Sequence, residues 1–193
     1  MGKMLCFLYD SMVSFEMTLA CSLLQSNGKP ILSIGYEKIP VKCSANLTLH
    51  PEKTVGEMLA NGLGEIEGLI IPGGYTRVVK PELKQLIRKL DGEGKLLAAI
   101  CAGPEFLAKS GALNGKKYTT TLTPGSYDEN NEEDPFDRGN YLEQRLVRDR
   151  NVVTAKGSAF VDFALGILSW FDMFDNEAEK EEFRKYYTPS AAF

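Results

Sequence analysis

Short apolar runs alternate along the chain with segments in which apolar residues recur at helical spacing. The apolar runs are bounded by turn-forming residues, as β-strands are, and they lie at Lys3–Tyr9, Ile31–Tyr36, Ile66–Ile71, Lys95–Ile100 and Val152–Ala155. Helices are predicted after them, from Phe15 to Gly28, Val55 to Asn61, Pro81 to Leu90, Pro104 to the Gly111 or Asn114–Gly115 turn, and Ser158 to Phe171. The weakly alternating segment Val41–Leu49 is expected to be a hairpin or an edge strand.

Strands that alternate with helices predict an α/β fold in which a mostly parallel sheet carries helices on both faces. Ligands of such sheets bind beyond the carboxyl ends of the strands. Three predicted strand ends carry unusual residues, namely Asp10–Glu16, Pro72–Tyr75 and Cys101–Pro104. We therefore expect the functional site where these three segments meet.

A chain of 193 residues is expected to form one domain. We assign residues 1–175 to the domain and 176–193 to a C-terminal helix and tail that belong to it, with the helix at Asn176–Tyr187 and the tail at Thr188–Phe193. The segment Asp128–Asp137 carries six acidic side chains and is expected to be a solvated loop or lid. It lacks the glycine that a calcium loop needs at its sixth position.

Composition narrows the range of partners. The chain has 22 basic and 26 acidic residues, a net charge of -4 and no basic cluster, so nucleic acid is not expected to bind. No run reaches the roughly 18 apolar residues of a membrane span. The four cysteines form no CxxC pair and there is one histidine, so we expect no metal site, no cofactor, no disulfide framework and a reducing, cytoplasmic compartment.

Cys101 lies between a buried strand and a helix, with the small residues Ala102 and Gly103 behind it. A sharp strand-to-helix turn of this kind, a nucleophile elbow, lifts its central side chain above the sheet and turns backbone N–H groups towards it. The partial positive charge at the helix start is expected to lower the pKa of Cys101 below about 8.5. Spacing alone equally allows a small apolar side chain packed at a turn. Cys6 and Cys21 are expected to be core residues.

Glu16, at the start of the first helix, is the second candidate. An acid beside a thiolate tends to become protonated and can then shuttle a proton, whereas the plain alternative is a first-turn glutamate that faces water. Gly73 and Gly74 follow a buried strand and could offer backbone N–H groups to a developing oxyanion. His50, the single histidine, is expected on the surface, which leaves Cys101 without an obvious general base.

These residues resemble the DJ-1/PfpI superfamily, relatives of class I glutamine amidotransferases with a flavodoxin-like three-layer sandwich. Four segments carry the resemblance: Phe15–Glu16, Leu69–Gly74, Ala98–Pro104 and Val153–Gly157 before a Phe-Ala-Leu helix. The resemblance implies that Cys101 is the reactive cysteine, Glu16 its partner acid, and Gly74 and Ala102 the backbone donors around it.

Three positions depart from branches of the superfamily. The protease branch has histidine after the cysteine, where this chain has Ala102. The glyoxalase and deglycase branch often has a histidine on the strand that Tyr118–Thr121 occupies here, and an arginine where this chain has Ala45. Tyr118 and Thr121 could supply hydrogen bonds in that place, but neither is a base near pH 7.

The resemblance implies a cysteine-dependent enzyme that acts on small reactive carbonyl compounds or their adducts, with Cys101 as nucleophile and Glu16 as proton shuttle. The alternative is an oxidative-stress sensor whose Cys101 reacts with an oxidant. An intracellular amidase or peptidase is a third hypothesis, and it would need a base.

A homodimer is expected as well, because members of the superfamily are commonly dimers. The first helix supports it through Met12, Val13, Met17 and Cys21, which form more apolar surface than one sheet face should need. The alternative is that these side chains pack under the Val41–Leu49 hairpin of the same chain.

Overall fold

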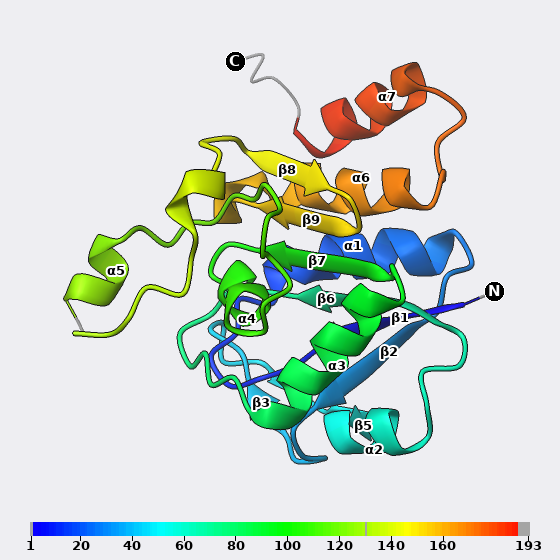
Figure 1. The fold of residues 1–193 in the computed structure, drawn as a ribbon. Helices are drawn as coiled ribbons and strands as arrows, with labels where there is room; N and C mark the ends of the chain where they lie inside the picture. The colour runs from blue at the N-terminus through cyan, green and yellow to red at the C-terminus, as the bar shows by residue number, and fades with distance from the viewer. Residues whose placement is uncertain (1, 130, 189–193) are drawn as a thin grey trace.

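A seven-stranded sheet with the strand order β5-β2-β1-β6-β7-β9-β8 forms the centre of the protein (Figure 1). The computed structural model describes residues 2–129 and 131–188. All neighbouring strands of the sheet are parallel except β8 and β9, which are antiparallel. The strands are β1 (Lys3–Phe7), β2 (Ile31–Gly35), β5 (Lys53–Thr54), β6 (Ile66–Ile71), β7 (Leu96–Ile100), β8 (Leu146–Asp149) and β9 (Val152–Ala155).

Helices cover both faces of the sheet (Figure 1). On one face α1 (Phe15–Ser26) packs against α6 (Phe160–Trp170), and α7 (Glu177–Tyr187) packs on α6. On the other face lie α2 (Val55–Ala60), α3 (Pro81–Gly92) and α4 (Pro104–Lys109). This arrangement confirms the predicted mostly parallel α/β sandwich. Shorter elements are β3 (Val41–Lys42), β4 (Thr48–Leu49), α5 (Gly125–Asp128) and the 3-10 helices η1 (Arg138–Asn140) and η2 (Gly157–Ala159).

The core follows from the apolar runs in the sequence. Every residue of β7 is fully buried, because helices cover both faces of the strand and only a continuously apolar run tolerates that environment. β6 differs only at Glu67, a half-buried side chain that pairs with Lys29 at the amino end of the sheet. The predicted hairpin is also confirmed, since β3 and β4 pair antiparallel.

Two strands were not predicted, and both lie at an edge of the sheet. β5 is two residues long, and its Thr54 also forms a capping box with Glu57 at the start of α2. β8 includes the polar pair Arg148 and Asp149, as an edge strand that contacts solvent does. Neither segment has the apolar run by which buried strands are recognised.

The acidic segment Asp128–Asp137 is not entirely a solvated loop. Its Phe136 is buried and stacks on Tyr118 with ring centroids 5.2 Å apart, and Asp134 pairs with Arg138. One aromatic anchor therefore holds this otherwise polar segment against the domain. Of the expected C-terminal tail, residues 189–193 lie outside the described residues.

The apolar residues expected to form a dimer surface on the first helix are largely internal. Met12 and Met17 are buried within the chain. Met12 also accepts a hydrogen bond from the backbone of Ser44 in the β3–β4 hairpin, at 2.8 Å. Met12 and Met17 therefore cannot form a dimer surface, whereas Val13 and Cys21 are only partly buried.

Replacement of a central-strand side chain should test this account of the core. Ile70→Ala on β6 is expected to lower the free energy of unfolding by about 2–5 kcal/mol, because it removes a fully buried side chain and leaves a cavity. Ile39→Ala, at a half-exposed side chain, should change it by less than about 0.5 kcal/mol. Denaturant unfolding of both variants measures the difference, and equal losses would contradict the assignment of Ile70 to the core.

Candidate active site

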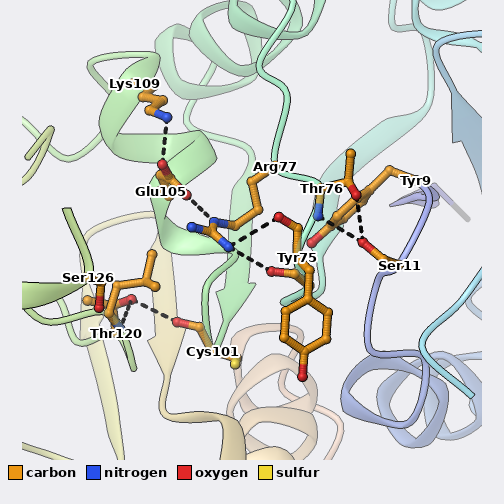
Figure 2. Close-up of polar contacts among 12 residues, drawn as sticks. Tyr9, Ser11, Tyr75, Thr76, Arg77, Cys101, Glu105, Lys109, Thr120 and Ser126 are labelled. Atoms are coloured by element: carbon orange, nitrogen blue, oxygen red, sulfur yellow. Dashed lines mark hydrogen bonds and ion pairs between the residues drawn. The ribbon is translucent and has the colours of Figure 1, made fainter. Parts of the chain in front are cut away.

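Cys101 occupies a sharp turn between β7 and α4. Its φ angle is +62°, a left-handed conformation that non-glycine residues rarely adopt. Hydrogen bonds hold both polar groups of its backbone. The N–H donates to the carbonyl of Ala155 at 2.9 Å, and the carbonyl accepts from the Thr121 N–H at 2.9 Å. The carbonyl also accepts from the Thr120 hydroxyl at 2.7 Å (Figure 2). The predicted elbow is therefore present, with its strain supported from two neighbouring segments.

Glu16 lies in the first turn of α1 and is only 3% exposed, so the reading of a water-facing glutamate is wrong. Its Oε2 accepts a hydrogen bond from the backbone N–H of Gly73 at 2.8 Å. Two glycines enclose the Glu16–Cys101 pair. A Cβ added at Gly73 would lie 2.9 Å from Cys101 Sγ and 2.7 Å from Glu16 Oε2, and one added at Gly157 would lie 3.0 Å from Sγ and from Glu16 Oε1. Only glycine leaves room for the pair.

The two acids of this pair change each other's proton affinity. Burial raises the pKa of Glu16, although hydrogen bonds from the Cys101 thiol and the Gly73 N–H oppose the rise. Burial, followed by the charge of Glu16 and the hydrogen bond to it, raises the pKa of Cys101 to about 11. The resting pair is therefore a thiol that donates to a carboxylate. The sequence-based expectation of a lowered pKa for Cys101 was wrong, because burial and Glu16 outweigh the helix start.

Of the other predicted site residues, Thr121 and Ala102 contact the Cys101 thiol and Tyr118 does not. The Thr121 hydroxyl and the Ala102 N–H both hydrogen-bond the thiol and lower the pKa of Cys101 against the larger effects of burial and Glu16. Thr121 Oγ1 in turn accepts from the Gly157 N–H at 3.1 Å. The Tyr118 hydroxyl instead donates to the carbonyl of Asp137, so the structure does not bring Tyr118 to the site.

Gly74 is held in place by its close neighbours. A Cβ there would lie 2.7 Å from both Met12 Cα and the Tyr9 hydroxyl oxygen, so a residue with a side chain does not fit at this position. Its carbonyl accepts from Arg77 at 3.0 Å. The N–H of Gly73, by contrast, is already bonded to Glu16, so Gly73 orients the acid.

The remaining thiols and the histidine lie apart from this pair. Cys6 is buried, which confirms that it is a core residue. Cys21 is only partly buried and lies at the margin of the core. A hydrogen bond that the Ser14 hydroxyl donates to the sulfur lowers the pKa of Cys43, a buried cysteine of the hairpin that was not among the predicted site residues. His50 is exposed beside the hairpin, as predicted.

A buried ion cluster beside the elbow was not foreseen. Glu105, on α4, is 1% exposed and pairs with both Arg77 and Lys109 (Figure 2). Arg77 also donates to the carbonyls of Gly74 and Tyr75, so the cluster ties the Gly74–Arg77 loop to the helix that carries the elbow. Only the i,i+4 spacing of Glu105 and Lys109 was visible in the sequence.

Within residues 2–129 and 131–188, no three histidine, cysteine or carboxylate side chains gather as a metal site would require. None of the helices described in that range has the length and apolar character to cross a membrane.

Comparison with known proteins assigns the chain to a family. The model of the DJ-1/PfpI family matches residues 2–169. The chain is 32% identical over 136 residues to the Parkinson disease protein 7 homolog of Danio rerio, covering 68% of each protein. It is 29% identical over 163 residues to the glutathione-independent glyoxalase DJR-1.2 of Caenorhabditis elegans, covering 79% of each.

A solved structure agrees with these sequence matches. The DJ-1 superfamily protein Atu0886 of Agrobacterium tumefaciens superposes with a TM-score of 0.82 at 27% identity, over 97% of this chain and 98% of that one. The match therefore includes the strands and helices that build the elbow and the Glu16 site. The chain belongs to the DJ-1/PfpI family.

Proposed function

We propose that the protein is a cysteine-dependent enzyme acting on small reactive carbonyl compounds or their adducts, as glyoxalases and deglycases do. The observation that carries the proposal is the buried contact between the Glu16 carboxylate and the Cys101 thiol. The pair contains both a nucleophile and its own base. It therefore needs no histidine to begin the reaction.

The first step joins Cys101 to the aldehyde. As Sγ attacks the carbonyl carbon, the thiol proton passes to Glu16 and the electrons of the C=O bond move to oxygen. That oxygen then takes the proton from Glu16, which gives a hemithioacetal and restores the carboxylate. The raised pKa of Glu16 brings its proton affinity closer to neutrality, where it can both accept and return a proton.

The second step rearranges the adduct of an oxoaldehyde such as methylglyoxal. Glu16 removes the proton from the carbon that carries sulfur, and the electrons of that C–H bond form the C=C bond of an enediolate while the C=O electrons move to the ketone oxygen. The hydroxyl proton of the sulfur-bearing carbon passes to that oxygen, and Glu16 returns its proton to the neighbouring carbon, so that a thioester of the 2-hydroxy acid results. Water then cleaves the thioester to lactate and frees the thiol. The Ala102 N–H and the Thr121 hydroxyl, which hydrogen-bond the thiol, are the nearest donors for the changing charge, and Gly74 is a third candidate.

Oxidant sensing through Cys101 ranks second. Oxidation by peroxide proceeds from the thiolate, and the pKa of Cys101 near 11 keeps that form scarce at neutral pH. Peptide hydrolysis ranks third, because His50 is exposed beside the hairpin and Ala102 stands where the protease branch has histidine.

We also propose a homodimer, now on a different surface from the one first expected. Phe15 and Leu47 are 56% and 61% exposed at the start of α1 and in the β3–β4 turn, where large apolar side chains favour contact with a second copy. Light scattering at micromolar concentration should give twice 21.4 kDa. Leu47→Lys should shift the mass towards the monomer, whereas a monomeric wild type would refute the dimer.

Turnover of methylglyoxal tests the enzyme directly. The wild-type protein should form lactate without added glutathione, and Cys101→Ala should abolish the reaction because the nucleophile is lost. Tyr118→Phe, which removes a hydroxyl that the structure places away from the thiol, should keep most of the activity. Equal rates for the wild type and Cys101→Ala would show that Cys101 is not the nucleophile.

Glu16→Gln should separate thiol reactivity from turnover. Removal of the negative charge beside the thiol lowers the pKa of Cys101, so alkylation by iodoacetamide at pH 7.5 should become faster, by about tenfold for each unit of pKa. Carbonyl turnover should fall at least about a hundredfold, since the proton shuttle is gone. The alkylation rate is followed by peptide mass spectrometry of Cys101 between pH 6 and 11. A pH dependence of Cys101 alkylation that is the same in Glu16→Gln and the wild type would contradict a proton shared between Glu16 and Cys101.

A further inference from the structure

An open cavity of about 420 Å³ adjoins Cys101 on the side of β9. Thr121 and the segments 143–145 and 156–158 line it. Two of these residues also contact the nucleophile: Thr121 hydrogen-bonds the thiol, and Gly157 lies against Sγ closely enough to exclude a side chain. The cavity and the reacting sulfur therefore share Thr121 and Gly157 as neighbours.

The cavity carries two cations on neighbouring backbone segments. The N–H of Lys156 donates to the carbonyl of Arg145 at 2.9 Å, at the end of the antiparallel pairing of β8 with β9, which places the two residues side by side. The Lys156 side chain is 22% exposed, and its Nζ donates to the Tyr141 hydroxyl at 2.5 Å. Burial opposes the charge of Lys156, but the bonds to Tyr141 and Glu143 raise its pKa overall. Its ammonium group is thus held in a fixed place.

The present partner of Lys156 is itself a carboxylate. Glu143 Oε1 lies 3.0 Å from Lys156 Nζ, and the Glu143 side chain is 77% exposed. Because the Glu143 end of this ion pair is exposed to solvent, another carboxylate can replace Glu143 on Lys156. Arg145 pairs with Asp162, and Asp162 also pairs with Arg184 of α7. One carboxylate is therefore shared between two guanidinium groups.

We propose that this cavity is an anion subsite that binds a carboxylate carried by the carbonyl substrate, with Lys156 as its anchor and Arg145 as a second cation. The inference rests on the proposed function, whose site it shares, and it narrows the substrate class to carbonyl compounds and adducts with a negatively charged end. The Glu143 carboxylate on Lys156 shows the geometry that such a group would adopt. The subsite would also hold the carboxylate of a 2-hydroxy acid product.

Alkylation of Cys101 by one anionic and one neutral reagent tests the subsite without any turnover. Iodoacetate and iodoacetamide deliver nearly the same group, but only iodoacetate carries a carboxylate. The ratio of their rates at Cys101, measured by peptide mass spectrometry at low salt, cancels the thiolate fraction. Lys156→Met should lower the iodoacetate-to-iodoacetamide ratio by about three- to tenfold, because one nearby positive charge is lost.

Three further variants complete the experiment. Lys156→Arg should keep the ratio, Glu143→Gln should raise it because the competing carboxylate is removed, and Lys89→Met, at an exposed position on α3, should leave it unchanged. A constant iodoacetamide rate in Lys156→Met shows that the variant is folded around the thiol. If the iodoacetamide rate of Lys156→Met changes, the rate ratios of Lys156→Arg and Glu143→Gln decide whether the anion subsite exists.

The possible outcomes separate the two proposals. A ratio that Lys156→Met and Glu143→Gln leave unchanged would overturn the anion subsite, whether or not methylglyoxal is consumed. A ratio that moves in the two expected directions supports the subsite even if no lactate forms, in which case only the proposed reaction fails.

Discussion

The left-handed backbone at Cys101 is the constraint from which the rest of the site follows. A non-glycine residue at φ +62° is stable only where surrounding groups hold it, and here β9 accepts its N–H while residues 120 and 121 donate to its carbonyl. The strand that supplies Ala155 continues directly into Lys156 and Gly157, which reach the cavity and the thiol. The segment after Gly115 likewise supports the elbow and places Thr121 beside the sulfur. The supports of the turn and the walls of the site are therefore the same segments.

Burial of two acids in contact has a definite consequence for reactivity. Because two negative charges cannot both be stable in that space, Glu16 and Cys101 hold one proton between them at neutral pH. The raised pKa of the thiol protects it from reagents that need a free thiolate, whereas a carbonyl that approaches the pair meets a nucleophile and a base together. Gly73 and Gly157 maintain this contact by leaving no side chain between the two groups and the backbone.

The sequence predicted those parts of the molecule that depend on continuous apolar runs or on local turns. β6 and β7, the elbow and the α1 start all follow from patterns within about ten residues, and the three strand ends that were singled out do meet at one site. The sign of the pKa shift at Cys101 was missed because it depends on burial and on Glu16, 85 positions away in the chain. The Arg77–Glu105 pair and the position of Lys156 depend on tertiary contacts as well. β8 was missed because edge strands do not need an apolar run.

The glyoxalase and deglycase branch often has a histidine in the segment that corresponds to Tyr118–Thr121 here. In this chain Thr121 of that segment donates to the thiol and cannot act as a base near neutral pH. Glu16 must therefore release each proton that it accepts from the thiol or from carbon before the next catalytic cycle begins. An isomerisation of an oxoaldehyde satisfies that condition, since every proton removed is returned to the same molecule. Peptide hydrolysis would also return every proton, because Glu16 could pass the thiol proton to the leaving amine before water cleaves the thioester. Proton transfer at Glu16 therefore does not separate the two reactions, and proteolysis is disfavoured instead by Ala102, which stands where the protease branch has histidine.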